Sequence, residues 1–447
     1  MLSIKEKVAY GLGDTASNII FQTVMMFLLV YYTDVVGLSP AVVGTMFLLV
    51  RLIDAITDPL MGAMSDRTKT RWGRYRPYLI WLAVPFGLIS LLTFTSFDIF
   101  SDYKLAYAVV TYTLLMLIYT AINIPYSALA SALTNDPSQR VSIQSYRFVF
   151  GMLGGLLIAG GTLPLVEYFG QGDLAAGYSK TMAIMGILGV ILFTLCFLGT
   201  KERVVAPPVT DRSLVQDFKD LLKNDQWRVL SAVGVFLLSG QVLRASLAIY
   251  YVSYYLASPD LVTLFITSGM VASIIGCSLS SGLAKHVCKV KAYIVLQTFA
   301  ATICVISYWI APSQVVLAFI AYILWNFVLQ MATPLLWAKM ADTSDYGEWK
   351  TGTQLNGMIY SSIVFFIKLG IAIGGAAAGW LLSYYEYEAG QVHSEFTLHG
   401  ILLCFTVLSS VGSFLAAAVM RWYTLTDSKV GEINETLNKK PSKIIME

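Results

Sequence analysis

Long apolar stretches recur along almost the whole chain, and they limit the possible folds more than any other feature. Residues 184–198, for example, are apolar almost without interruption. A bilayer core about 30 Å thick needs roughly 20 apolar residues per helix. Only 13% of the 447 residues are charged and the mean hydropathy is +0.68, whereas about a quarter of the residues in soluble proteins are charged. We therefore expect a chain that lies in lipid.

Polar breaks divide the chain into twelve stretches of membrane-spanning length. Their unbroken apolar character predicts helices, because the strands of a membrane barrel alternate apolar and polar residues. The predicted spans are residues 9–33, 41–63, 78–97, 105–133, 142–168, 177–199, 229–256, 261–284, 291–311, 314–338, 354–383 and 398–422. The expected fold class is an all-α membrane protein with twelve transmembrane helices.

The longest polar interruption falls between spans six and seven. It contains Pro207-Pro208 and a short amphipathic stretch at residues 214–222. Transporters of this size are commonly built from two six-helix halves with a substrate site near the midplane. The expected organisation is an N-terminal half at 1–199, a central cytoplasmic loop at 200–228, a C-terminal half at 229–423 and a cytoplasmic tail at 424–447.

The positive charges orient the predicted bundle. Most of the 30 Lys and Arg residues fall in segments on the side of the termini, as in residues 67–76, and the opposite loops hold only Lys104 and Lys180. The positive-inside rule then places both termini in the cytoplasm of a multi-pass inner-membrane protein. The first span is expected to be retained, because it leads directly into further spans.

Several classes of protein are excluded. The net charge of +3 does not suggest nucleic-acid binding. The five cysteines are scattered without a C-x-x-C pair and the three histidines lie in loops or at a helix end, so neither a metal cluster nor a histidine proton relay is expected. No Walker-type loop or nucleophile elbow is visible. We expect no enzyme activity, no catalytic residue and no cofactor, with energy supplied by an ion gradient.

Span two has a compact group of charges. Arg51, Asp54, Thr57 and Asp58 occupy positions i, i+3, i+6 and i+7, close to one helical face. Two carboxylates four residues apart repel unless a cation or proton lies between them. Such a pair suits a coupling site for Na⁺ or H⁺. The alternative is a structural network in which Arg51 and Lys368 neutralise the aspartates.

Further polar groups lie within spans one and four. Asp14 and Asn18 are one helical turn apart, and Asn123 lies between Tyr119 and Tyr126. Amides, carboxylates and aromatic rings together suit a polyhydroxylated ligand, whose hydroxyls need hydrogen bonds and whose C–H faces stack on rings. Buried amides equally serve helix contacts, so both interpretations stay open.

Two arginines also lie in or beside the spans. Arg147 begins span five and either reaches the substrate or binds the cytoplasmic loops. Arg244 lies near the middle of span seven. It either neutralises Asp14 or binds an acidic group on the substrate, and we favour the structural role.

Several motifs together resemble the glycoside–pentoside–hexuronide:cation symporters, a branch of the major facilitator superfamily. The loop after span two resembles the superfamily's G-x-x-x-D-R signature at Gly62–Arg67. The further motifs are Tyr10–Asp14, Tyr31–Gly37, Arg51–Pro59, Arg71–Pro77 and Asp345–Gly352. The resemblance covers nearly the whole chain and implies a major facilitator fold that imports a glycoside with Na⁺, Li⁺ or H⁺ by alternating access.

The resemblance also implies roles for individual residues. It assigns Asp54, Asp58 and Thr120 to the cation site, where Thr57 replaces an asparagine of the family. Its helix-eleven lysine corresponds to Lys368 and its helix-five arginine to Arg147.

The sequence departs from the melibiose carrier of that family at the sugar site. Asn18, Asn123 and Ser127 stand where that carrier has two aspartates and a tryptophan. A galactoside is therefore not expected, and the pattern is closer to carriers of xylosides, other pentosides or glucosides.

Charged cytoplasmic loops can hold the halves of such a carrier in one state. The candidates for this gating role are Asp66, Arg67, Arg74, Glu348 and Lys350, the last two in an expected loop between spans ten and eleven. Each is alternatively a solvated loop residue. We expect a monomer whose partners are a small glycoside and the lipid bilayer. The alternatives are an exchanger or facilitator, a transport-inactive sugar sensor, and an enzyme acting on lipid-linked sugars, for which we can assign no catalytic pair.

Overall fold

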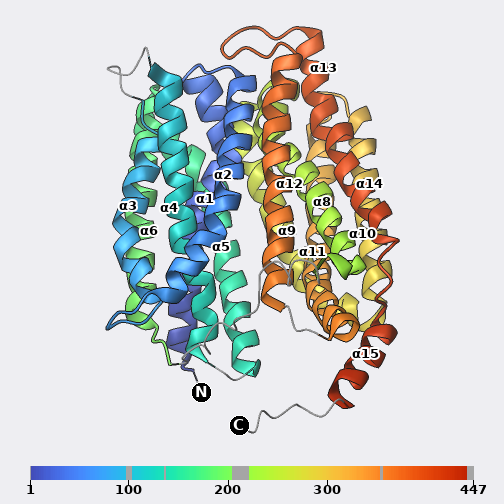
Figure 1. Cartoon of the computed structure of the whole chain (residues 1–447). Coiled ribbons are helices and arrows are strands. Elements are labelled where there is room, and N and C mark those ends of the chain that lie inside the picture. The colour runs from blue at the N-terminus through green and yellow to red at the C-terminus, as the bar shows by residue number, and fades with distance from the viewer. Residues whose placement is uncertain (1, 97–102, 135–136, 204–220, 353–355, 440–447) are drawn as a thin grey trace. The chain divides into compact units, whose positions relative to one another are not determined.

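The computed structural model describes residues 2–96, 103–134, 137–203, 221–352 and 356–439. Within these ranges every regular element is a helix, apart from a single bridge between Thr70 and Gly73. The prediction of an all-α protein is confirmed (Figure 1).

Twelve long helical segments correspond to the twelve predicted spans. They are α1 (Ile4–Val30, extended by a π-helical turn at Tyr31–Val35), α2 (Pro40–Arg67), α3 (Arg76–Thr93), α4 (Lys104–Leu133), α5 (Pro137–Gly170), α6 (Leu174–Gly199), α8 (Asp225–Tyr250, extended by a π-helical turn at Tyr251–Tyr255), α9 (Val262–His286), α10 (Lys289–Ile306), α11 (Val315–Thr351), α12 (Asn356–Tyr384), and α13 with α14 (Glu395–Leu403 and Ser409–Met420, joined by a π-helical turn at Cys404–Leu408). In the described residues 11 of these helical segments are long and apolar enough to cross a membrane, and α2, which holds the charges of predicted span two, is not among them.

One expected loop is helical instead. Helix α11 continues through residues 345–350 and ends only at Gly352, whose φ of +70° is the left-handed conformation that commonly ends a helix. The prediction was wrong because it ended the span where apolar residues end. A helix continues past the apolar stretch where its residues allow helical geometry. Glu348 and Lys350 therefore lie on the last turns of a helix.

The first compact unit comprises residues 1–208, 245–270 and 375–401. Helix α1 packs against α5 and α6, and α3 packs against α4 and α6. Helices α2 and α12 approach closely where glycines replace side chains. A Cβ at Gly379 would lie 2.3 Å from the carbonyl oxygen of Pro40. Small residues at such crossings are typical of helix packing in membranes.

The second compact unit comprises residues 209–244, 271–374 and 402–447. Here α10 packs against α11 and α14. A further helix, α15 (Asp427–Lys439), follows the last span and lies beside α11 (Figure 1). The buried Lys339 ammonium of α11 joins the two helices, with Asp342 at 2.8 Å and Asp427 at 3.1 Å.

Candidate functional site

The predicted cation-site residues come together between α2 and α4 in the first unit. The Thr120 hydroxyl lies 3.1 Å from the Asp58 carboxylate and also donates to Asp54. Asp54 is 1% exposed. The spacing on α2 brings both carboxylates to the face that α4 covers, as their helical positions predicted.

Arg51 partly balances the two carboxylates. Its guanidinium is 5% exposed and lies 3.8 Å from the Asp54 carboxylate. If both aspartates are ionised, the three side chains carry one net negative charge. Thr57, the fourth predicted member, instead donates its hydroxyl to the Asp54 backbone carbonyl at 3.1 Å. The threonine hydrogen is therefore used within α2.

A second charged group links α1 and α5. Arg147 Nε donates to the Asp14 carboxylate at 2.8 Å, and Asn18 Nδ2 donates to the other Asp14 oxygen at 3.1 Å. Gly151, one turn after Arg147, allows this approach, because a Cβ there would lie 2.2 Å from Asp14 Oδ2. Arg147 was expected to reach the substrate or to bind the cytoplasmic loops, but the structure pairs it with Asp14. Arg147 also reaches Ser127 Oγ at 3.3 Å.

Aromatic residues of α1 and α4 surround this ion pair. The Arg147 guanidinium lies over the Tyr126 ring, with 5.2 Å between Cζ and the ring centroid. Tyr126 in turn stacks on Tyr10 at 4.8 Å and donates its hydroxyl to the Tyr10 carbonyl. The sequence identified Tyr126, but Tyr10 appeared there only as part of a family motif.

Asn123 has an unusual amide. Its Nδ2 donates to the Tyr119 hydroxyl at 3.0 Å, whereas its Oδ1 is buried and has no hydrogen-bond partner among the described residues. Buried polar atoms are nearly always hydrogen-bonded in folded proteins. An acceptor in this condition can take a hydroxyl hydrogen from a ligand.

Two predicted residues belong to the second unit. Arg244 is 1% exposed and is enclosed by aromatic rings, with 4.4 Å to Trp325, 4.3 Å to Phe405 and a contact to Cys304. Cation–π contacts of this kind stabilise a desolvated guanidinium. The structural role that we favoured for Arg244 was to neutralise Asp14, but the ion pair that the structure gives Asp14 is with Arg147. Lys368 lies on α12 and is partly exposed.

The gating candidates divide between the two units. The Asp66 side chain lies outside the described residues, and Arg67 is exposed at the end of α2. Arg74 lies in a loop that wraps around Glu202, whose carboxylate accepts the backbone N–H groups of residues 74, 75 and 76 at 2.8, 2.8 and 2.9 Å. In the second unit Lys350 pairs with Asp225 at 2.5 Å.

Sequence reasoning missed Glu202 and Asp225. Both are single carboxylates at the borders of the central loop, far along the chain from their partners, and no spacing rule links them to those partners. The signal nearest to Glu202 is Gly73, which has φ +113° and where a Cβ would lie 2.4 Å from the carboxylate carbon. Gly73, which lies between basic residues, thus marks the place where the Glu202 carboxylate closely approaches the backbone. Only the fold shows that Glu202 is the group that approaches.

Comparison with known proteins gives consistent findings. The profile of a family described as "MFS/sugar transport protein" matches residues 9–427. The inner membrane symporter YicJ of Escherichia coli (strain K12) is 38% identical over 439 residues, which are 98% of this chain and 95% of that protein. The isoprimeverose transporter of Lactiplantibacillus pentosus is 32% identical over 95% of this chain and 89% of that protein. Among solved structures, a D-xylose–proton symporter superposes with a TM-score of 0.65 at 14% identity, covering 94% of this chain and 97% of that one.

Proposed function

The chain belongs to the family described as MFS/sugar transport protein, and we propose that it imports a glycoside together with Na⁺ or H⁺ as a secondary active transporter. Membership of this family makes it a multi-pass membrane transporter of sugars. The coupling ion, the class of glycoside and the direction of transport are the content of the proposal. One observation carries it, the Thr120 hydroxyl shared by the buried Asp54 and the partly exposed Asp58.

A threonine hydroxyl has one hydrogen and can donate it to one acceptor at a time. Asp54 and Asp58 both lie within hydrogen-bond distance of the same oxygen. The two carboxylates therefore compete for this one hydrogen, and a proton or a cation held between them would satisfy both. Carboxylate and hydroxyl oxygens are hard ligands that suit Na⁺, and a carboxylate that is kept neutral suits H⁺.

The second group of residues supports a sugar as the co-substrate. Asn18 and Asn123 present amides, and the Oδ1 atom of Asn123 is a buried acceptor without a partner among the described residues. A sugar hydroxyl supplies the missing donor, and the rings of Tyr119 and Tyr126 suit its C–H faces. Because these groups are amides, the ligand we favour is a neutral xyloside or glucoside. The isoprimeverose transporter is one relative whose name specifies a sugar.

The coupling follows from charge. When the cation site is unoccupied, two ionised carboxylates lie close together in the membrane and repel each other, which is costly. Filling the site removes this cost and favours closure around bound sugar. A coupling of this kind is a difference in binding free energy that each ligand imposes on the other.

The test is uptake of labelled xylosides, glucosides, galactosides and uronides by cells that express the protein. Each sugar is measured with and without Na⁺, and with and without a protonophore. Accumulation that needs Na⁺ and survives the protonophore identifies Na⁺, and accumulation abolished by the protonophore without a Na⁺ requirement identifies H⁺. Counterflow without accumulation would show an exchanger or facilitator and contradict the proposal.

Variants then locate the coupling. Asp58→Asn keeps the shape of the side chain but removes its charge. We expect accumulation to fall at least tenfold, while counterflow falls less. Asp260→Asn, the same chemical change at an exposed turn, serves as the matched control and should behave as the unsubstituted protein. Full ion dependence in Asp58→Asn would exclude this site as the coupling site.

A further inference from the structure

Two helices of the first unit end in the same unusual way. Helix α1 ends in the π-helical turn Tyr31–Val35, and α8 ends in the π-helical turn Tyr251–Tyr255. Each turn closes with an N–H donated back over five residues, Val36 to Tyr31 in one and Leu256 to Tyr251 in the other. Isolated π-helical turns are rare and often occur at functional sites.

The sequence repeats in the same two places. The pair Tyr31-Tyr32 is followed by Ser39-Pro40, and Tyr250-Tyr251 is followed by Ser258-Pro259 at the same interval. A residue with positive φ follows each turn, Gly37 at +78° and Ala257 at +48°. The first helix of each predicted half therefore ends in an equivalent structure.

Asp34 and Tyr254 are the fourth residues of these two turns, and they bind each other. The Tyr254 hydroxyl donates to Asp34 Oδ2 at 2.8 Å. One residue earlier in α1, the Thr33 hydroxyl shares a hydrogen bond of 2.8 Å with the Tyr250 hydroxyl. The ends of α1 and α8 are thus joined by two side-chain hydrogen bonds, one between the two turns and one from Thr33 to the last α-helical residue of α8.

A third segment covers this contact. Tyr387, in the connection between α12 and α13, donates to both oxygens of Asp34 at 3.0 and 2.9 Å. His393 stacks on the Tyr387 ring at 4.9 Å and meets the Tyr254 ring edge-on at 4.5 Å. The pKa of the Tyr387 hydroxyl is raised, mainly because the group is buried and secondly because the Asp34 charge is nearby. The hydroxyl therefore stays protonated and acts as a donor.

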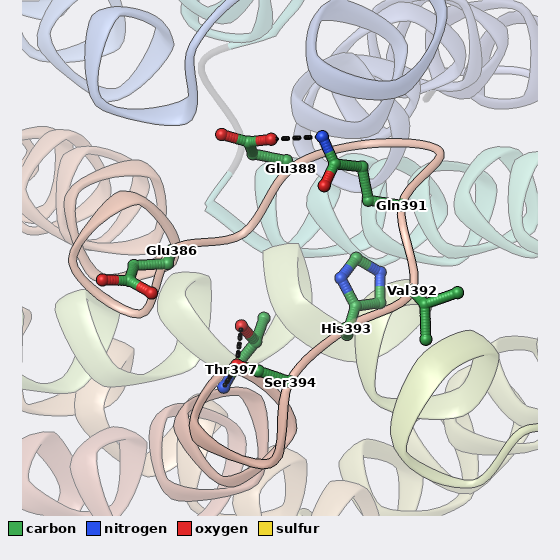
Figure 2. Close-up of a pocket in the computed structure, with 7 residues that line it drawn as sticks. All are labelled: Glu386, Glu388, Gln391, Val392, His393, Ser394 and Thr397. Atoms are coloured by element: carbon green, nitrogen blue, oxygen red, sulfur yellow. Dashed lines mark hydrogen bonds between the residues drawn. The ribbon is translucent and has the colours of Figure 1, made fainter.

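The outer side of this connection is hollowed. Figure 2 shows the pocket lined by Glu386, Glu388, Gln391, Val392, His393, Ser394 and Thr397, with His393 near its centre. Tyr387 itself is 3% exposed. The connection therefore supplies both the buried Tyr387 that binds Asp34 and the residues that line the pocket.

We propose that Asp34, Tyr254 and Tyr387 form a gate that closes the end of the first unit remote from the N-terminus, and that Asp34 must release both tyrosines before substrate enters there. The three hydroxyls of Thr33, Tyr254 and Tyr387 bind the carboxylate, and no Lys or Arg of the described residues forms an ion pair with it. When the gate opens, water replaces the neutral hydroxyl donors, so that only part of the free energy of these hydrogen bonds is lost. Such a contact can open and close repeatedly, whereas breaking a buried ion pair is strongly unfavourable.

The test measures opening directly and needs no substrate. Thr33 is 2% exposed, so Thr33→Cys places a thiol that reagents reach only when the gate opens. The rate of its labelling by a membrane-impermeant maleimide is measured in right-side-out and inverted vesicles. The unsubstituted protein, with its five native cysteines, gives the background. The gate proposal rests on the proposed function. The labelling experiment uses no sugar, so the gate proposal and the proposed function can fail independently of each other.

In the Thr33→Cys background we expect Asp34→Asn to raise the labelling rate about tenfold or more, because an amide is a weaker acceptor than a carboxylate. Tyr387→Phe and Tyr254→Phe should each raise the rate about threefold to tenfold, and they provide the test if Asp34→Asn does not fold. Tyr384→Phe is the matched control, since Tyr384 lies three residues away and is 69% exposed. The gate is excluded if the folded variants label no faster than Thr33→Cys alone, or if Tyr384→Phe raises the rate equally.

Discussion

At the scale of single residues, the ion pair between Asp14 and Arg147 depends on the absence of a side chain at Gly151. The Asp14 carboxylate occupies the space that a Cβ would need, and Asn18 holds the second carboxylate oxygen. A second nitrogen atom of the Arg147 guanidinium then donates a hydrogen bond to the Ser127 hydroxyl. A charge pair in the membrane is tolerated when its hydrogen bonds are satisfied in this way.

Gly151→Ala is expected to separate Asp14 from Arg147. The added methyl would lie 2.2 Å from Asp14 Oδ2, so the carboxylate must move, at a cost of about 1–3 kcal/mol in the free energy of unfolding. Uptake should fall about tenfold or more. Gly161→Ala is the control on the same helix, because nothing lies within 4 Å of its Cβ. Equal uptake by the two variants would contradict this role of Gly151.

The positions of Asp54 and Asp58 could be predicted at this scale because helical spacing alone places the two aspartates on one face, whereas Thr120 was assigned to the site only by the resemblance to a known family. The partner of Asp14 was predicted wrongly, since the sequence analysis considered only Arg244 for that role. Only the packing of α1 on α5 selects Arg147. Asn123 was predicted as a polar residue facing a ligand, but its unsatisfied oxygen became visible only with the neighbouring atoms in place.

At the scale of elements, the loop between α2 and α3 is organised by one carboxylate that follows α6. Glu202 accepts three consecutive N–H groups at the start of α3, where a helix has donors without intrahelical acceptors. The Arg76 side chain adds a bond of 2.6 Å to the Phe197 carbonyl. The charged loop that the sequence predicted to be a gate is therefore held in place by its backbone.

Glu202→Gln should loosen this loop. An amide presents one acceptor and one donor where the carboxylate presents two acceptors, so at least one backbone N–H group loses its partner, at about 1–3 kcal/mol. We expect faster hydrogen exchange at residues 73–76 and a lower melting temperature. Glu167→Gln, at an exposed position on α5, is the control. Unchanged exchange at residues 73–76 would show that Glu202 does not hold the loop.

Helix α15 is held on the second unit by a contact that depends on pH. Burial tends to raise the pKa of Asp427, but the Lys289 N–H and the Lys339 ammonium outweigh it and lower the pKa below its usual value. A carboxyl with a lowered pKa stabilises the folded state above its unfolded pKa of about 4. This stabilisation is lost as the pH falls further.

Asp427→Asn should therefore lower the melting temperature at pH 6–7, and its difference from the unsubstituted protein should shrink as the pH falls below about 4. The measurement is thermal unfolding of the purified protein across this pH range. Glu432→Gln, an exposed carboxylate on the same helix, is the control. A difference that stays constant with pH would mean that Asp427 acts through packing rather than charge.

At the scale of the whole molecule, hydropathy was sufficient for the number and order of the spans because each helix must satisfy its own backbone in lipid. The ends of the spans were less predictable. Helix α11 runs to Thr351, beyond its apolar stretch, because helical geometry does not stop at the membrane surface. Composition did not predict the π-helical turns. Two of them nevertheless share a sequence pattern, because a Tyr-Tyr pair lies where each turn begins and a Ser-Pro pair follows each turn.

A bound coupling ion should stabilise the entire carrier. An ion that binds only the folded state adds RT ln(1 + [ion]/Kd), about 1.4 kcal/mol at ten times Kd. If the site between Asp54 and Asp58 takes Na⁺, the melting temperature should rise with NaCl but not with choline chloride at equal ionic strength. If it takes H⁺, Na⁺ should have no effect and stability should rise with the proton concentration. In either case Asp58→Asn should remove the response and Asp260→Asn should keep it. A response that persists in Asp58→Asn would place the ion elsewhere, because the amide cannot replace the charge that the carboxylate pair supplies.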